Sequence, residues 1–282
     1  DANLLAPLIT GLAKKAIPVE KDPRLKAVKQ VLTAFDGSLL PVLPKILWAL
    51  WLDDKHRAAK LHLEFDILKG VPVKGDITHA NENEKTVFRK NLSSGKIYVF
   101  DAGLAQYSLF DDIVKANRSF VARIKDNAVW DIEERPLAKD AISAGVNKDM
   151  VVRLGCKGKK DGMSFNVRVI EIYHKGDSTR PRASMVSSKK TFRTTESDYT
   201  FLLATDRMDL PAGTIALIYR YRWQIELFFR WFKCILGCRH FLAHSENGLT
   251  IQVYCALIAS LLQSEHLRCY VSISWVGLQV KT

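Results

Sequence analysis

Short apolar runs that end at turn residues alternate with amphipathic stretches in the first 125 residues, and this alternation limits the chain to a mixed α/β fold. Strand-like runs cover 31–35, 61–68, 71–77, 97–100 and 120–124, and helix-like stretches cover 81–92 and 104–116. Gly70 predicts a hairpin between the second and third strands. The expected order is therefore strand, strand, strand, helix, strand, helix, strand.

The middle of the chain has a different character. Residues 125–198 carry Gly, Ser, Lys and Asp clusters, two clear strands at 150–154 and 165–173, and no long helical periodicity. The basic, Ser/Thr-rich stretch 175–197 predicts a loop or hairpin. A solvated surface and a phosphate-contacting surface are equally good interpretations of its charge.

Helical patterns return at the end of the chain. A strand is expected at 199–204, and Pro211 then opens a long helix that is expected to reach Leu236, because proline is favoured in the first turn of a helix. Gly237 is a plausible end signal for that helix. A second helix is expected over 247–267.

The charge balance indicates the kind of partner. The 282 residues include 42 Lys and Arg against 30 Asp and Glu, a net charge of +12, which favours nucleic acid first and an anionic membrane second. The apolar stretch 249–262 is shorter than the roughly 20 residues of a membrane span, so we expect a buried helix there and no membrane association. No signal peptide is visible, and five scattered cysteines favour a cytosolic protein with free thiols.

The long helix carries the most informative residues. At 100° per residue, Tyr219, Arg222, Glu226 and Lys233 lie within an arc of about 60°, and Arg230 lies close by. One interpretation is an ordinary amphipathic helix with an Arg222–Glu226 ion pair that is worth a few tenths of a kcal/mol. The sharper interpretation is metal-dependent phosphoryl transfer, in which the one acid holds a divalent ion while the cations and the phenol grip a DNA backbone.

The spacing Y-x2-R-x3-E-x6-K formed by these residues resembles the signature of insertion-sequence transposases of the IS-four family, which belong to the DDE, RNase H-like superfamily. The resemblance extends from about Phe35 to Leu262. It implies an RNase H-like mixed sheet that is flanked by helices and interrupted by a β-rich insertion before the last catalytic helix. The implied parts are 1–125 and 199–282 for the catalytic core and 126–198 for the insertion.

The same resemblance implies a catalytic triad. The segment DGSLLPVLPKILWALW is similar to the first family motif and places an acid at Asp36, and YVFDAGLAQYSLF is similar to the second and places an acid at Asp101. Both aspartates are expected at the ends of apolar strands, and Glu226 supplies the third acid. The triad would bind two Mg²⁺ or Mn²⁺ ions and would be both the metal site and the catalytic site.

The resemblance also implies partners and an activity. DNA contacts are expected from Tyr219, Arg222, Arg230, Lys233 and, from the segment KLHL, Lys60. The expected activity is cleavage at transposon ends and strand transfer into target DNA, by a homodimer on paired ends in a bacterial cytoplasm, near the nucleoid. Trp130 is a candidate for stacking on a flipped base. Two alternatives remain: an RNase H-like structure-specific nuclease, and a catalytically inactive DNA-binding protein derived from a transposase.

Overall fold

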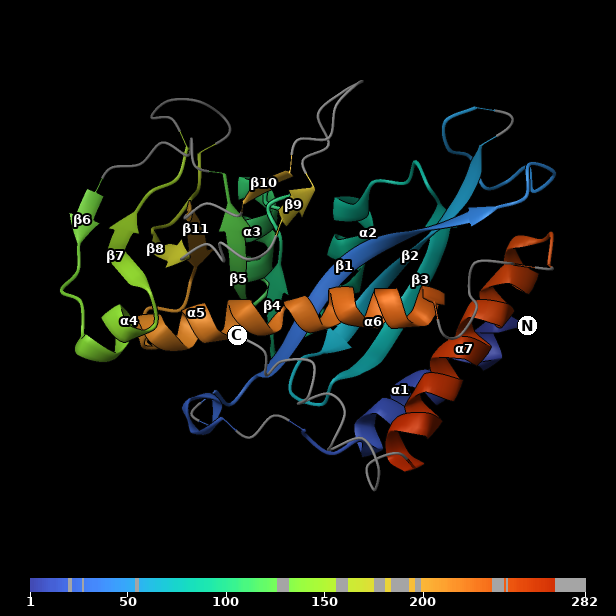
Figure 1. Cartoon of the computed structure of the whole chain (residues 1–282), viewed down its shortest axis with the longest axis horizontal. Helices are drawn as coiled ribbons and strands as arrows, with labels where there is room; N and C mark the ends of the chain where they lie inside the picture. The colour runs from blue at the N-terminus through green and yellow to red at the C-terminus, as the bar shows by residue number, and fades with distance from the viewer. Residues whose placement is uncertain are drawn as a thin grey trace. The chain divides into compact units, whose positions relative to one another are not determined.

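The computed structural model describes residues 1–19, 22–26, 28–53, 56–125, 132–155, 162–174, 181–183, 193–195, 199–234, 241 and 243–266 (Figure 1). The chain forms two compact units. Unit 1 contains residues 1–99 and 221–282, and unit 2 contains residues 100–220. The expected division into a catalytic core and an insertion at 126–198 was based on function, whereas these units are defined by their internal contacts. The expected division therefore stays a prediction.

Unit 1 is built on four neighbouring strands in the order β3-β2-β1-β4. The strands are β1 (Val31–Val42), β2 (Arg57–Asp66), β3 (Val71–His79) and β4 (Lys96–Phe100). β1, β2 and β3 are antiparallel, whereas β4 runs parallel to β1. The hairpin between β2 and β3 turns at Gly70, whose φ of 66° is a conformation that glycine adopts at little cost.

The helices of unit 1 come from both of its segments, 1–99 and 221–282. They are η1 (Ala2–Leu4), α1 (Ala6–Lys15), η2 (Pro23–Leu25), α2 (Glu84–Asn91), α6 (Trp223–Cys234) and α7 (Glu246–His266). α2 confirms the helix expected after the hairpin, and the side chain of Asn83 caps its first turn by accepting from the Lys85 amide.

Two helices cover opposite faces of the unit 1 sheet (Figure 1). On one face Phe35 of β1 stacks on Phe88 of α2, with ring centroids 4.3 Å apart. On the other face Phe65 of β2 packs against Phe228 of α6 at 5.4 Å. Because alternate residues of a strand point to alternate faces, this packing decides which helix each polar side chain of β1 meets.

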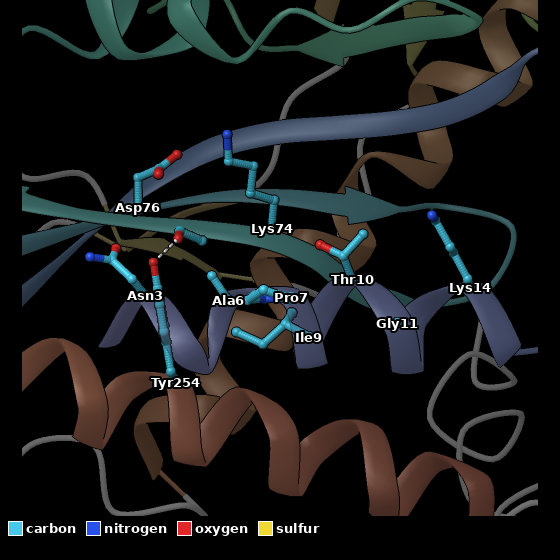
Figure 2. A pocket seen from close by; sticks show the side chains of 11 residues that line it. Asn3, Ala6, Pro7, Ile9, Thr10, Gly11, Lys14, Lys74, Asp76 and Tyr254 are labelled. Carbon is cyan, nitrogen blue, oxygen red and sulfur yellow. Dashed lines mark hydrogen bonds between the residues drawn. The ribbon is translucent and has the colours of Figure 1, made fainter. Parts of the chain in front are cut away.

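Segments from the two ends of the chain pack beside β3. The hydroxyl of Tyr254 on α7 donates to the carbonyl of Gly75 at 2.8 Å (Figure 2). A cavity of about 580 Å³ lies between α1, β3 and α7. The apolar stretch 249–262 lies in α7, where Leu249, Val253 and Leu257 are fully buried. Over the described residues, no helix combines the length and apolarity that crossing a membrane requires.

Unit 2 contains an antiparallel sheet in the order β5-β11-β8-β7-β6. Its strands are β5 (Ser119–Ile124), β6 (Ile132–Glu134), β7 (Val146–Val152), β8 (Val167–His174) and β11 (Tyr199–Thr205), with a separate pair β9 (Pro181–Ala183) and β10 (Arg193–Thr195). Its helices are α3 (Tyr107–Lys115), α4 (Lys139–Ser143) and α5 (Ala212–Tyr221). The expected strand and helix order of the first region is confirmed, as are the β-rich middle region and the final strand.

Two expectations were wrong. β1 does not end at Asp36 but continues to Val42. The whole of β2 pairs with β1, and the last pair is Val42 opposite Arg57. The turn propensity of Asp36-Gly37-Ser38 is therefore overridden by strand pairing. What ends near Asp36 is the pairing with β4, whose last registered pair is Ala34 and Val99.

The long helix expected from Pro211 is also not continuous. α5 ends at Tyr221 and α6 begins at Trp223, with Arg222 in a turn between them. The amide of Ile225 donates to the Arg222 carbonyl at 3.1 Å, a tighter i to i+3 bond that starts the new helix. Glu226 and Lys233 share α6, and the Arg222 side chain still reaches Glu226 from the turn. Gly237 lies outside the described residues.

Candidate active site

Asp36 lies on the face of β1 that α6 covers. It is paired with Leu63, and Ala34, two residues earlier, is paired with Phe65, so all four side chains share that face. Oδ1 of Asp36 accepts a hydrogen bond from the Gly37 amide at 2.8 Å. The pKa of Asp36 is raised to about 6, chiefly by burial and to a smaller extent by the charges of Glu226 and Glu84, while the Gly37 amide and Arg222 oppose the shift. Burial is therefore the main reason that the ionised form of this carboxyl is disfavoured.

Glu226 occupies the first turn of α6 and belongs to the same unit. Its Oε1 accepts from Nη2 of Arg222 at 2.6 Å, which is the i,i+4 ion pair that the amphipathic interpretation predicted. The Arg222 side chain is 10% exposed and that of Glu226 is 31% exposed. The arginine thus points inward to the acid, and the acid retains one face toward solvent.

Asp101 and Tyr219 form a second pair, within unit 2. Asp101 directly follows β4, as expected, and its Oδ1 accepts from the Ala102 amide at 2.8 Å and from the Tyr219 hydroxyl at 3.0 Å. The ring of Tyr219 packs on Phe201 of β11, with centroids 5.8 Å apart. β11 thus supports the phenol whose hydroxyl holds the carboxylate.

The register of β1 and β4 relates the two aspartates along the chain. Ala34 and Val99 are the last paired residues of these parallel strands, and Asp36 and Asp101 each follow two residues later. Asp36 thus lies within β1, which continues to Val42, whereas Asp101 directly follows β4.

The remaining expected DNA-binding cations differ in exposure. Lys60 of β2 has a side chain that is 13% exposed and pairs with Oε1 of Glu84 at 3.1 Å. Arg230 is exposed on α6, and Lys233 is half-buried in its last turn. Trp130 lies outside the described residues.

The donor set can be tested for its fit to divalent ions. Hard carboxylate oxygens are the ligands that Mg²⁺ and Mn²⁺ prefer, and a bound cation would favour the ionised form of the buried Asp36 carboxyl. Asp36 and Glu226 offer such oxygens within unit 1. Across the described parts of the chain, no three His, Cys, Asp or Glu side chains are already gathered as metal ligands.

Sequence reasoning missed two residues at this site. Glu84 places its carboxylate against Gly37, so close that a Cβ on Gly37 would lie 2.9 Å from Oε1. Gly37 is not one of the glycines with a positive φ, so its backbone conformation does not require glycine. The close contact with Glu84 accounts for the absence of a side chain at this position. The sequence signal for this contact was a glycine next to a candidate catalytic acid, but that glycine was interpreted only as part of a turn.

Comparisons with known proteins place these observations in context. A family model described as a transposase DDE domain matches residues 28–262. A protein of Sinorhizobium fredii named as a transposase, y4zB, is 32% identical over 237 residues, which are 83% of this chain and 60% of the relative. A protein of Synechocystis sp. named as a transposase for the insertion sequence element IS4SA is 22% identical over 93% of this chain and 67% of its own length.

A solved structure was also matched. The piggyBac transposase synaptic complex with hairpin DNA has a TM-score of 0.43 and 9% identity, over 84% of this chain and 48% of that chain. The chain spans about 60% of the length of the y4zB relative.

Proposed function

Because the chain belongs to the family of transposase DDE domains, we propose that it catalyses the DNA chemistry of an insertion sequence. The proposed reaction begins with hydrolysis of a phosphodiester at a transposon end, which leaves a 3′ hydroxyl. That hydroxyl then attacks a phosphodiester of target DNA, joins to its phosphorus and releases a new 3′ hydroxyl. The alternatives are a structure-specific nuclease and an inactive DNA-binding protein.

Asp36, Asp101 and Glu226 are the proposed catalytic acids, and they would hold two Mg²⁺ or Mn²⁺ ions. Such ions activate the attacking oxygen and neutralise charge on the leaving oxygen in this class of reaction. Tyr219 keeps the Asp101 carboxylate oriented through its hydroxyl. Arg222 holds Glu226 in its first-turn position and limits the repulsion between this acid and Asp36.

The observation that carries the proposal is the environment of Asp36. An acid whose pKa is raised to about 6, chiefly by burial, costs folding free energy that an ordinary structural aspartate would avoid. Perturbed groups of this kind cluster at functional sites. A divalent cation would offset the cost by favouring the ionised carboxylate.

DNA is the proposed partner. The net charge of +12 favours a polyanion, and Lys60, Arg230 and Lys233 join Tyr219 and Arg222 as proposed backbone contacts. Transposases of the family that the sequence resembles act as dimers on paired transposon ends, and we propose the same assembly for the whole protein.

A cleavage and strand-transfer assay tests the proposal. Labelled linear DNA carrying the ends of the insertion sequence is incubated with the protein in Mg²⁺, in Mn²⁺ and in EDTA, beside an Asp101→Asn variant. Metal-dependent nicks at the ends and joined products are expected from wild type only. Nicks without joining would favour the nuclease, and binding without either product would favour the inactive protein.

A further inference from the structure

The Lys60–Glu84 ion pair lies next to Asp36, although it belongs to the other face of the sheet. Lys60 is paired with Leu39, and His62, two residues later, is paired with Gly37, so Lys60 and Gly37 share the face that α2 covers. Gly37 has no side chain, and the Glu84 carboxylate occupies the space that its Cβ would fill. The ion pair therefore reaches the backbone of the residue that follows Asp36.

Two acceptors fix the Lys60 ammonium. Its Nζ lies 3.1 Å from Oε1 of Glu84 and donates to the Glu82 carbonyl at 3.3 Å. Glu84 lies in the first turn of α2, and Glu82 directly precedes Asn83, the residue that caps this helix. An ammonium has three N–H donors, so a third can reach a phosphate while these two contacts persist.

The low exposure of the Lys60 side chain is consistent with an ammonium that Glu84 holds in place. The Lys60 side chain is 13% exposed and that of Glu84 is 33% exposed. A lysine on a flexible stem otherwise loses considerable rotamer entropy when it binds a phosphate. A lysine that is already held in place loses less, which favours both affinity and a fixed register of the DNA.

We propose that Glu84 is a positioning residue of the catalytic centre: it holds the Lys60 ammonium beside the Gly37 backbone so that Lys60 contacts a DNA phosphate next to the one that reacts. This inference rests on the proposed function. It also gives Gly37 a reason to be glycine, since any side chain there displaces the Glu84 carboxylate.

The salt dependence of DNA binding gives a readout that does not require turnover. Each phosphate contact contributes about −0.9 to the slope of log K against log salt concentration on duplex DNA. Lys60→Met is expected to reduce the slope by about that amount. Glu84→Gln is expected to reduce it in the same direction, and the double variant is expected to add nothing further.

The direction in which Glu84→Gln changes DNA binding distinguishes a positioning role from a general charge effect. Removing a negative charge from a DNA-binding protein strengthens binding if only long-range charge matters. Glu246→Gln is the matched control, because Glu246 also lies in the first turn of a helix of unit 1. It is expected to keep the wild-type slope. A Glu84→Gln slope equal to that of Glu246→Gln, or additive effects of the Lys60 and Glu84 variants, would overturn the positioning role.

Further measurements complete the test. Glu84→Asp keeps the charge and a favourable first-turn residue but shortens the side chain, so it should fold and still lose part of the slope. The Mn²⁺-induced rise in melting temperature should be unchanged in Glu84→Gln, and its loss would make Glu84 a metal ligand and overturn the proposal. Absence of metal-dependent cleavage in wild type would refute the proposed function alone, since the slopes are measured without cleavage.

Discussion

The Tyr219 hydroxyl donates a 3.0 Å hydrogen bond to Oδ1 of Asp101, and the two residues are 118 positions apart in the chain. Tyr219 is the first residue of the signature that sequence analysis placed on a DNA-binding stripe. Within unit 2 its hydroxyl bonds to a carboxylate. The signature tyrosine therefore has an orienting contact to a proposed metal ligand.

Tyr219→Phe should reduce cleavage with little change in folding. The phenylalanine keeps the packing on Phe201 and loses the hydroxyl bond to the carboxylate. A hydrogen bond to a charged group is worth roughly 1.5–3 kcal/mol, so we expect a loss of about tenfold or more in the single-turnover cleavage rate. Tyr199→Phe is the control, because Tyr199 also packs on Phe201. Equal rates for the two variants would show that the hydroxyl bond is dispensable.

Asp36→Asn should stabilise the metal-free protein at pH 8. The folded pKa of about 6 lies above the ordinary value of 3.8, so the contribution of this carboxyl to stability is fully present below pH 3.8 and is lost as the pH rises through 6. At pH 8 the ionised acid costs up to about 3 kcal/mol, which the amide avoids. Thermal unfolding in EDTA and in Mn²⁺ measures both effects: the variant should melt higher than wild type in EDTA and gain nothing from Mn²⁺.

Asp209→Asn gives the opposite sign in the same measurement. The hydrogen bond from Arg207 lowers the pKa of Asp209, so its charge stabilises the fold at pH 8. The melting temperature should fall slightly in EDTA, and the Mn²⁺ response should stay as in wild type. A higher melting temperature for both variants would point to general charge effects rather than to the site.

Glu226→Gln should separate catalysis from folding. The amide oxygen can still accept from Arg222, and the side chain is partly exposed, so the melting temperature should stay near that of wild type. DNA binding should persist, while cleavage and strand transfer in Mg²⁺ should fall below detection, because the charge that holds a divalent ion is gone. Retained cleavage would exclude Glu226 as a metal ligand, and failure to fold would identify a structural ion pair.

His62 should make the protein sensitive to acid. Its ring is 1% exposed, and Nε2 lies 2.8 Å from the Thr78 hydroxyl. Burial, followed by the charge of Lys60, lowers the pKa of His62 to about 4, while Asp76 and Glu82 oppose the shift. Its neutral form stabilises the fold above pH 6.5, and this contribution is lost as the pH falls from 6.5 toward 4, by up to about 3 kcal/mol.

Urea unfolding at pH 7 and pH 5 measures this contribution. The loss of free energy between the two pH values should be smaller in His62→Gln than in wild type. His56→Gln should lose as much as wild type, because His56 is exposed beside Asp53. Equal losses in all three proteins would assign the acid sensitivity to other groups.

Arg168 and Asp149 should behave as a buried ion pair whose partners depend on each other. Arg168 Nε and Nη2 donate to the two carboxylate oxygens at 2.8 and 2.6 Å, and both residues are buried. Arg168→Met leaves the aspartate uncompensated, at a cost of about 3–5 kcal/mol. Arg153→Met, which removes an exposed arginine bonded to Asn166, should cost far less. Urea unfolding of the two variants gives the comparison.

Local pattern predicted most of the strands and helices, because each has enough periodicity within its own length. The strand and helix order from β1 to β5 could be written from apolar runs and turn residues alone, whereas α1 was not predicted. The end of β1 could not, because the residues that keep Asp36-Gly37-Ser38 extended belong to β2. The break at Arg222 could not either, since no Pro or Gly marks it.

The candidate site shows the same limit. Asp36, Asp101 and Glu226 were proposed from motifs, and the structure gives each a specific local partner. Glu84 was hidden because its relation to Gly37 joins the start of α2 to the middle of β1, 47 positions away along the sequence. A contact between residues so far apart produces no periodic pattern in the sequence from which it could be predicted.

The division into units has a practical consequence for engineering. Unit 2 is one uninterrupted segment, 100–220, whereas unit 1 is assembled from the segments on either side of it. Exchanging that segment with its counterpart from a relative would transplant Asp101 and Tyr219 together, while Asp36, Arg222 and Glu226 remain with the recipient. Such chimaeras would carry the two junctions at 99/100 and 220/221, so the second junction cuts the signature between its tyrosine and its arginine.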